Sequence, residues 1–402
     1  MKKTCVIGLG YIGLPTAVLL ASRGNKVIGV DIDQSIISSI NDMISHIKEA
    51  DLDKALEKVV KEGNLCATNK VEKADNFLIT VPTPFTLSEN QLPQPDISYI
   101  IKAIHSIADY IEPGNLIILE STSPVGTTEK IANILEELTG INTDQLNIAY
   151  CPERVLPGRI LHELEHNDRV IGGLTEKASI LAREFYSQFC QGEFAITTSK
   201  IAELVKLTEN AFRDVNIAFA NELSLVCHQL DINSFELISL ANKHPRVNIL
   251  KPGSGVGGHC IAVDPWFIAA DFPEITPLIQ SARLVNDNKS KWVVSELIKL
   301  NEELKLKLNR APILGCLGLT FKPNVDDLRE SPALYIVKEL IRLGVNIIAC
   351  EPNIKNYDSI KLFSLDEVLT KSDLVVNLVE HSSFKDINYE KYHVFDVCGL
   401  IK

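Results

Sequence analysis

The sequence lacks the cysteine pattern of a secreted or zinc-binding protein. Its nine cysteines are an odd number and are spread along the whole chain, with no C-x-x-C pair and no Cys/His spacing typical of zinc. This usage indicates a reducing compartment. We therefore expect neither a disulfide framework nor a metal site.

A long apolar run and an excess of positive charge are also missing. No segment approaches the ~20 uninterrupted apolar residues of a membrane helix. The apolar run after the N-terminal lysines resembles a secretory leader, but Gly8, Gly10, Gly13 and Pro15 interrupt it. The formal net charge of -12 gives no general attraction to nucleic acid or to an anionic membrane. We expect a cytoplasmic protein that binds neither nucleic acid nor membrane.

Helix and strand patterns alternate at both ends of the 402-residue chain. A strand at residues 4–10, a helix at 12–23 and a strand at 26–31 form a first βαβ unit. Further strands are predicted at residues 76–81, 115–120, 147–150, 311–319, 346–350 and 374–378. Such alternation is typical of doubly wound parallel sheets, so the fold class is α/β with two Rossmann-like domains.

The middle of the chain is helical. Apolar residues recur every three or four positions from Ser199 to Val226 without Gly or Pro, which predicts one long helix. This helix is too long for a typical crossover, so we expect it to span domains or to pack on a second subunit. The predicted domains are residues 1–198, 199–300 and 301–402.

A glycine motif lies between the first strand and the first helix. Its glycines permit a tight turn and a close approach of backbone to a pyrophosphate at the helix N-terminus. Asp31, at the end of the next strand, can accept a hydrogen bond from a ribose 2′-hydroxyl and would repel a 2′-phosphate. The pattern predicts NAD rather than NADP. The expected cofactor-binding residues are Gly8, Gly10, Tyr11, Ile12, Gly13 and Asp31.

Polar residues follow three further predicted strands. Thr83 in VPTP and Thr122 in ESTSPVG would face a cofactor, because ligands of such sheets bind beyond the carboxyl ends of the strands. Glu153 in CPER would be a general base if burial raised its pKa. Simple turns for the two threonines, and an exposed ion pair for the glutamate, remain open alternatives.

Two side chains of the long helix share one face with Glu203. Lys206 and Asn210 are four residues apart, so both can hold a developing oxyanion. A solvated helix face is the alternative, and the pattern alone favours it.

The loop SGVGGHCIAVDP places Cys260 behind glycines and four residues before Asp264. Glycines let a backbone approach a ligand, and a thiol there is expected to be accessible, with Ser254 and His259 at its borders. Beside a nicotinamide, the thiolate would add to an aldehyde, and loss of hydride would give a thioester that water hydrolyses to an acid. Asp264 would orient that water or the cysteine. By contrast, we expect burial for Cys5, Cys227, Cys316 and Cys350.

Two cations follow the first strand of the C-terminal domain. Lys322 and Arg329 on this loop suggest phosphate recognition, and ion pairs with Asp326, Asp327 or Glu330 are the alternative. Ser331 is expected to cap the next helix, with Pro332 at its first position.

Seven motifs in order resemble the UDP-glucose/GDP-mannose dehydrogenase family over essentially the whole chain. They are GLGYIGLP, VPTP, ESTSPVGT, YCPERVLPG, AELVKLTENAFR, KPGSGVGGHCIAVDP and FKPNVDDLRESPA. The resemblance implies an NAD-dependent enzyme that oxidises the C6 alcohol of a nucleotide sugar to a carboxylate with two NAD per turnover. It also implies a homodimer through the helical middle domain.

The resemblance also implies individual roles. Cys260 matches the nucleophile, Lys206 and Asn210 match its oxyanion partners, and Asp264 matches an aid to the water or thiol. Glu153 matches the base for thioester hydrolysis.

Three further roles come from the same motifs. Thr122 matches an orienter of the catalytic water, Lys322 a residue that contacts the nucleotide sugar, and Arg329 one that reaches the NAD pyrophosphate.

One departure points to a branch of the family. UDP-glucose members tend to carry a second glutamate where this chain has Pro157. The motifs PERVLPGR and HPRVNILKPGSGVGGHCIAVDP look like the UDP-N-acetylhexosamine branch, which implies UDP-N-acetylmannosamine as substrate and a role in bacterial surface polysaccharides. The N-acetylglucosamine epimer stays open. Further substrate-binding residues implied by this likeness are Arg154, His244, Arg246, Asn248 and Gly257.

Other classes of function remain as alternatives. UDP-glucose is a further possible substrate, and a two-electron hydroxyacid dehydrogenase would need neither the thiol nor the second α/β domain. A silent sensor of NAD or nucleotide sugar would need no Cys260.

Overall fold

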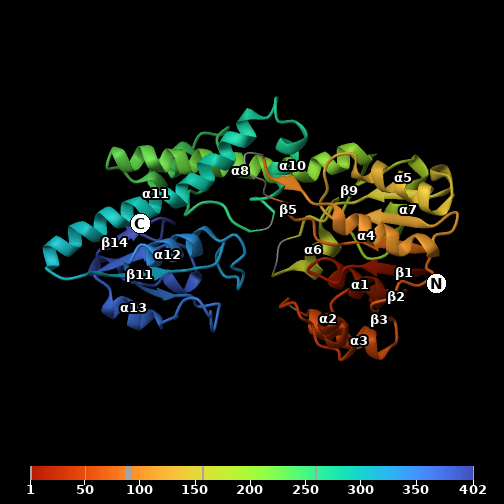
Figure 1. Ribbon diagram of the computed structural model, residues 1–402, viewed down its shortest axis with the longest axis horizontal. Helices are drawn as coiled ribbons and strands as arrows, with labels where there is room; N and C mark the ends of the chain where they lie inside the picture. The colour runs from red at the N-terminus through yellow and green to blue at the C-terminus, as the bar shows by residue number, and fades with distance from the viewer. Residues whose placement is uncertain (1, 50, 87–91, 156–157, 259, 402) are drawn as a thin grey trace. The chain divides into compact units, whose positions relative to one another are not determined.

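An eight-stranded sheet forms the centre of the first part of the chain. The structure is a computed structural model that describes residues 2–49, 51–86, 92–155, 158–258 and 260–401 (Figure 1). The chain divides into two units, Met1–Thr208 and Glu209–Lys402, each with its own sheet. The predicted fold class is confirmed.

The first unit is doubly wound. Its strand order is β10-β9-β8-β7-β4-β1-β2-β3, and all neighbours are parallel except β8 and β9. The strands are β1 (Lys3–Ile7), β2 (Lys26–Val30), β3 (Leu65–Thr68), β4 (Asn76–Ile79), β7 (Leu116–Leu119), β8 (Asn147–Tyr150), β9 (Arg169–Gly173) and β10 (Phe194–Thr198). A separate antiparallel pair is β5 (Phe85–Thr86) with β6 (Gln94–Pro95). The antiparallel β8–β9 pair is a local departure from the expected parallel sheet.

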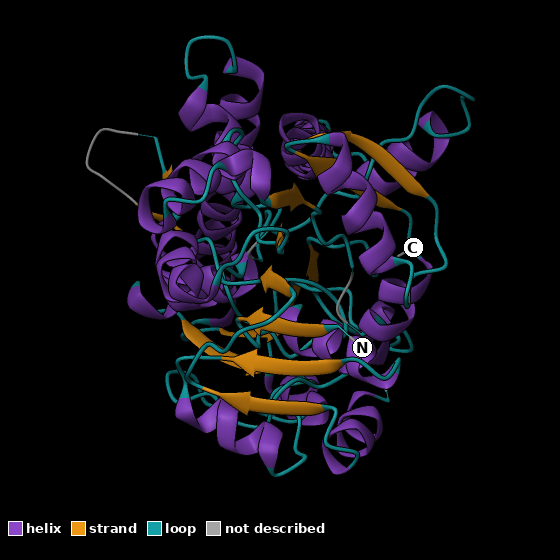
Figure 2. Ribbon diagram, turned by 90° about the vertical axis from the view of Figure 1, so that its right-hand side faces the viewer, coloured by secondary structure: helices purple, strands orange, loops and turns teal. Residues whose placement is uncertain are grey.

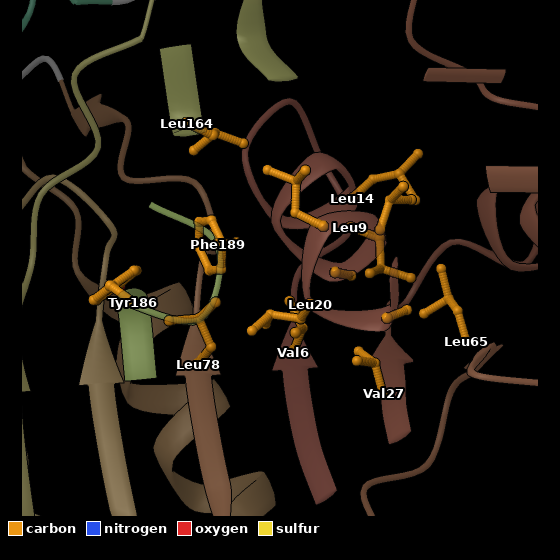
Figure 3. Packing of buried hydrophobic residues seen from close by; sticks show 14 of the residues in the cluster. Val6, Leu9, Leu14, Leu20, Val27, Leu65, Leu78, Leu164, Tyr186 and Phe189 are labelled. Atoms are coloured by element: carbon orange, nitrogen blue, oxygen red, sulfur yellow. The ribbon is translucent and has the colours of Figure 1, made fainter. Parts of the chain in front are cut away.

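Helices cover both faces of this sheet (Figure 2). They are α1 (Gly13–Ser22), α2 (Gln34–Asn41), α3 (Leu52–Lys61), α4 (Ser98–Ile107), α5 (Thr127–Thr139), α6 (Ile160–His166) and α7 (Glu176–Tyr186). Val6 and Leu78 pack in one apolar layer, whereas their neighbours Ile7 and Ile79 pack in the other (Figure 3 shows the first). Successive side chains of a strand point to opposite faces, so a sheet buried on both faces needs continuous apolar strands.

The second unit combines long helices with a smaller sheet of order β12-β11-β13-β14. Its strands are β11 (Ile313–Leu317), β12 (Asn346–Cys350), β13 (Leu374–Asn377) and β14 (Val394–Asp396), and all are parallel. Its helices include α9 (Ser234–Ala241), α10 (Asp264–Asp271), α11 (Pro277–Leu308), α12 (Pro332–Arg342) and α13 (Leu365–Lys371).

The predicted long helix is α8 (Ser199–Gln229), and the boundary between the two units falls within it. Ser331 caps α12 by accepting from the Leu334 N–H, with Pro332 in the first turn, as predicted. Within the described ranges, no helix is long and apolar enough to cross a membrane.

Candidate active site

The turn after β1 fits a dinucleotide. Gly8 has a φ of 93°, and its N–H donates to the Val30 carbonyl at 2.8 Å. A Cβ on Gly13 would lie 1.9 Å from the Gly8 oxygen, so only glycine lets the helix pack this closely. A Cβ on Gly10 would meet nothing within 4 Å, which leaves open space over the turn. This is where backbone must approach a pyrophosphate.

The Asp31 carboxylate is fixed in place beside that turn. One oxygen accepts from the Leu9 N–H at 2.8 Å and the other from the Asp33 N–H at 2.9 Å. Each oxygen keeps a lone pair, so the carboxylate can still accept from ribose hydroxyls. The neighbouring Ile32 is 93% exposed.

Replacing Asp31 by asparagine is expected to weaken NAD binding by about 10-fold or more, because a hydrogen bond to a charged acceptor contributes ~1.5–3 kcal/mol. The preference for NAD over NADP should narrow as well, because the negative charge is gone. Calorimetric titration with both cofactors measures the two constants. Asp109→Ala, at an exposed acid elsewhere in the unit, is the control and should bind NAD normally.

Thr83, Thr122 and Glu153 follow the carboxyl ends of β4, β7 and β8. These strands follow β1 in the sheet in the order β1-β4-β7-β8, with Ile7, Ile79, Leu119 and Tyr150 in register. Both threonines are half-buried. The structure therefore brings the three residues to the same edge of the sheet as the glycine turn.

Glu153 is buried and paired. Its Oε1 accepts from the Arg154 N–H at 2.6 Å, and its Oε2 lies 3.1 Å from Nη1 of the buried Arg169. Lys206 Nζ, from α8, donates to the Glu153 carbonyl at 2.8 Å. The first unit thus places Lys206 and Glu153 together, whereas the Arg154 guanidinium donates to the Asp168 carbonyl.

Three buried residues around Glu153 were missed by sequence reasoning. They are Glu120, Arg169 and Tyr186. Burial and the nearby charge of Glu153 raise the pKa of Glu120 to about 8, against the opposing effect of Arg169. The one available signal was a glutamate that directly follows the apolar strand β7.

The Glu203 side chain of α8 binds the start of α5, whereas Lys206 binds the Glu153 carbonyl. The Glu203 carboxylate accepts from the N–H groups of Gly126 and Thr128 and from the Thr128 hydroxyl, at 2.6 to 2.8 Å. It therefore caps α5 and holds the start of α8 against that helix.

The second unit brings Asn210, Cys260 and Asp264 together. Asn210 Nδ2 donates to Asp264 Oδ2 at 2.6 Å, and both side chains are buried. The Asp264 N–H donates to the Cys260 carbonyl at 2.8 Å, which places the cysteine just before α10. Cys260 is half-buried, whereas the four cysteines expected in strands or helices are buried, as predicted.

The glycines before Cys260 have a packing role. A Cβ on Gly257 would lie 2.3 Å from the Glu330 oxygen, and one on Gly258 would lie 2.7 Å from the Phe321 ring. The loop is therefore pressed against the segment that carries Lys322 and Arg329. His259 and Pro157, both used in the sequence argument, lie outside the described residues.

Arg329 forms an ion pair on its own loop. Its guanidinium binds both carboxylate oxygens of Asp327, at 2.6 to 3.1 Å, which is one of the pairings weighed from the sequence. Lys322 is half-buried, with Nζ 5.6 Å from the centre of the Phe321 ring. Both cations lie beyond the carboxyl end of β11.

The base of this loop repeats the geometry found at Asp31. Glu351, after β12, accepts from the Leu319 N–H at 2.7 Å, and His381 Nε2 lies 3.1 Å from the same oxygen. Burial alone would raise the pKa of Glu351, but these hydrogen bonds and one from the Asn353 N–H outweigh it and hold the pKa below its usual value. The His381 Nδ1 accepts from the Asn324 N–H at 3.0 Å and so anchors the loop.

The remaining predicted residues lie on an exposed turn after α9. His244, Arg246 and Asn248 are all exposed, and the Asn248 carbonyl accepts from the Asn216 amide at 3.3 Å. The structure leaves their side chains accessible to a ligand.

Three family models match successive parts of the chain. Family models of UDP-glucose/GDP-mannose dehydrogenases match at residues 2–190 (NAD binding domain), 200–288 (central domain) and 315–402 (UDP binding domain). The chain is 51% identical to a UDP-N-acetyl-D-mannosamine dehydrogenase of Campylobacter jejuni, over 97% of this chain and 98% of the relative. It is 48% identical to an NDP-N-acetyl-D-galactosaminuronic acid dehydrogenase of Ralstonia nicotianae, over 98% of this chain and 95% of the relative. The solved structure of a UDP-D-ManNAc dehydrogenase from Pyrococcus horikoshii matches with a TM-score of 0.90 and 41% identity. The match covers 100% of this chain and 96% of that chain.

Proposed function

The chain belongs to the UDP-glucose/GDP-mannose dehydrogenase family and is an NAD-dependent nucleotide-sugar dehydrogenase, and we propose that it oxidises UDP-N-acetyl-D-mannosamine to the 6-uronate. The observation that carries the proposed chemistry is the half-buried Cys260 beside the buried Asn210–Asp264 pair. The relative at 51% identity supports the choice of sugar. We further propose that the reaction occurs in the cytoplasm and supplies a uronate for bacterial surface polysaccharide.

The proposed reaction removes two pairs of electrons from C6. Bound NAD supplies the acceptor for each pair, and the turn at Gly8 with Asp31 would hold it. Between the two oxidations, the Cys260 thiolate bonds to C6 of the aldehyde, and the amide of Asn210 and the ammonium of Lys206 stabilise the oxyanion. After the second oxidation, C6 is a thioester of Cys260.

Hydrolysis of that thioester completes the reaction. A water oxygen bonds to C6, its proton passes to Glu153, and the C6–sulfur bond breaks to return the thiolate. Thr122 would orient the water, and Asp264 would orient the water or the thiol through Asn210. Lys322 and the exposed residues His244, Arg246 and Asn248 would hold the nucleotide sugar, with Arg154 and Gly257. Arg329 would bind the NAD pyrophosphate after leaving Asp327.

A panel of sugars tests this function. Purified protein with NAD should form two NADH per UDP-N-acetylmannosamine and one uronate, identified by mass spectrometry. UDP-N-acetylgalactosamine is included because of the relative at 48% identity, together with UDP-N-acetylglucosamine and UDP-glucose. If the protein oxidises another sugar of the panel faster, that sugar takes the place of UDP-N-acetylmannosamine as the substrate. One NADH formed per hydroxyacid would identify a two-electron hydroxyacid dehydrogenase. Binding of NAD or a nucleotide sugar without turnover would identify a sensor.

We also propose a homodimer through α8. Phe212, Phe219 and Val226 are 66%, 51% and 49% exposed and recur every seven residues, so they form one apolar seam. Phe219→Glu is expected to convert the dimer to monomers in analytical ultracentrifugation. Leu306→Glu, at an 84% exposed leucine of α11, is the matched control. A Phe219→Glu protein that stays dimeric contradicts the proposed interface.

A further inference from the structure

Two carboxyl groups are buried against a single guanidinium under the site in the first unit. Arg169, from β9, has Nη1 at 3.1 Å from Glu153 Oε2 and at 4.0 Å from Glu120 Oε1. The three side chains are 3%, 7% and 1% exposed, in the order Arg169, Glu153, Glu120. Glu120 follows β7 and Glu153 follows β8, so neighbouring strands hold the two carboxyl groups near one nitrogen.

Among the described residues, Arg169 is the positively charged group that acts on Glu120. The groups that influence it are Glu153, Arg169 and the Tyr186 hydroxyl, which donates to Glu120 Oε1 at 2.5 Å. The Arg169 guanidinium lies over the rings of Tyr186 and Phe189, at 4.4 and 5.6 Å. Figure 3 shows both rings within the apolar layer. The buried Cys151 thiol has its pKa raised to about 12 by burial, so it adds no charge at neutral pH.

Charge balance in this setting requires a proton. Two ionised carboxylates with one guanidinium would leave a net negative charge buried, and an uncompensated buried charge is costly. The proton belongs on Glu120, because Glu153 lies closer to Arg169 and accepts the Arg154 N–H, whereas Glu120 is held by a neutral phenol. Lys206 Nζ donates to the Glu153 backbone carbonyl, and Lys206 is not among the groups that shift the pKa of Glu120.

The partners of the carboxyl oxygens agree with a proton on Glu120. Among the described residues, Glu120 Oε2 is buried with no hydrogen-bond partner, whereas Glu153 Oε2 has its ion pair with Arg169. A buried polar atom without a partner is rare and calls for an explanation. A proton shared between the two carboxyl groups would give Glu120 Oε2 a hydrogen bond.

We propose that Glu120 and Glu153 form an acid–carboxylate pair that shares one proton, with Glu120 as its holder at neutral pH and Arg169 balancing the remaining charge. Glu120 is then a positioning residue that keeps Glu153 ionised and ready to accept a proton from water. This inference rests on the proposed role of Glu153 in hydrolysis. When the water proton reaches Glu153, the pair carries two protons and returns one to solvent.

Infrared spectroscopy tests the shared proton without using activity. Protein with isotopically labelled glutamate should show the carbonyl band of a protonated carboxylic acid at pH 7, and this band should be lost as the pH rises past about 8. The band should be missing from Glu120→Gln. Glu203→Gln removes another buried glutamate with a raised pKa and should leave the Glu120 band and its midpoint in place. A wild-type protein without the band, or Glu120→Gln with it, overturns the inference.

Kinetics then separates this inference from the proposed function. In wild type, the rate of uronate release should show a titration step near pH 8, which Glu120→Gln should lack while its rate at pH 7 falls by about 10-fold. Glu120→Asp should regain part of the titration step and part of the rate at pH 7 that Glu120→Gln loses. A step that persists in Glu120→Gln refutes the positioning role. If Glu153→Gln leaves uronate release unchanged, the proposed role of Glu153 fails, whereas the infrared result stands.

Discussion

Replacing Cys260 by serine is expected to lower uronate formation by at least about 10³-fold, because a serine hydroxyl is a far weaker nucleophile than a thiolate at neutral pH. The protein should still fold and bind NAD. Cys260 is half-buried and the Asn210–Asp264 hydrogen bond does not involve its sulfur, so the substitution disturbs little packing. Chromatography of the products, thermal unfolding and titration with NAD measure the three properties.

Two other cysteines serve as controls for this result. Cys66 is exposed, and Cys66→Ser should leave the activity and the stability unchanged. Cys316 lies in β11, where burial raises its thiol pKa to about 12, so Cys316→Ser should lower the stability but not the activity of each folded molecule. Normal uronate formation by the Cys260→Ser protein would refute the covalent mechanism.

Local backbone chemistry made the cofactor turn predictable from sequence. The positive φ of Gly8 and the close contact of Gly13 with the Gly8 carbonyl leave only glycine at these positions. Asp31 follows at the end of β2, where its carboxylate meets the same turn. A short segment thus contains all the information that sets this geometry.

The cluster around Cys260 could not be predicted from the spacing of residues in the sequence alone. Asn210 and Asp264 are 54 residues apart, and the bond between them depends on how α8 packs against the start of α10. The resemblance to a family suggested that they act together, whereas the pattern alone favoured a solvated face of α8. Gly257 and Gly258 were interpreted from the sequence as allowing approach to a ligand, and the structure shows that they also pack against the Lys322 loop.

The clustering of the buried Glu120, Arg169 and Tyr186 could not be predicted from the sequence. Glu120 follows β7, Arg169 begins β9 and Tyr186 ends α7, and only the packing of these elements brings the three residues together. The length of α11 was missed for another reason. Its charged residues 301–308 were set apart from the helical region, but glutamate, lysine and leucine all favour helix, and α11 continues to Leu308.

Arg283 and Asp214 form another buried ion pair, which joins α11 to α8. Arg283 Nη1 donates to Asp214 Oδ1 at 2.6 Å, and the Asn286 amide donates to the same oxygen at 2.8 Å. Asp214 is 0% exposed and lies one turn after Asn210 on α8. The pair therefore fixes the helix that presents Asn210 to Asp264.

Arg283→Met is expected to lower the free energy of unfolding by about 3–5 kcal/mol at pH 8, because it leaves the Asp214 charge buried without a partner. Burial already raises the pKa of Asp214 from 3.8 to about 6 against the effect of Arg283, and loss of the arginine would raise it further. The folded protein then binds a proton that the unfolded chain does not, so stability falls as pH rises from 3.8 through the folded-state pKa. The destabilisation should be smaller at pH 5 than at pH 8, as measured by denaturant unfolding at both.

Two further variants separate the buried charge from the loss of side-chain packing. Adding Asp214→Leu to Arg283→Met removes both charges, so most of the stability should return and its pH dependence should disappear. Arg310→Met breaks an exposed pair with Asp373, in which the arginine is 54% exposed, and should cost less than about 1 kcal/mol. If the double variant is as unstable as Arg283→Met, the pair acts through shape rather than charge. If Arg283→Met is no less stable than Arg310→Met, the pair does not hold α8 in place.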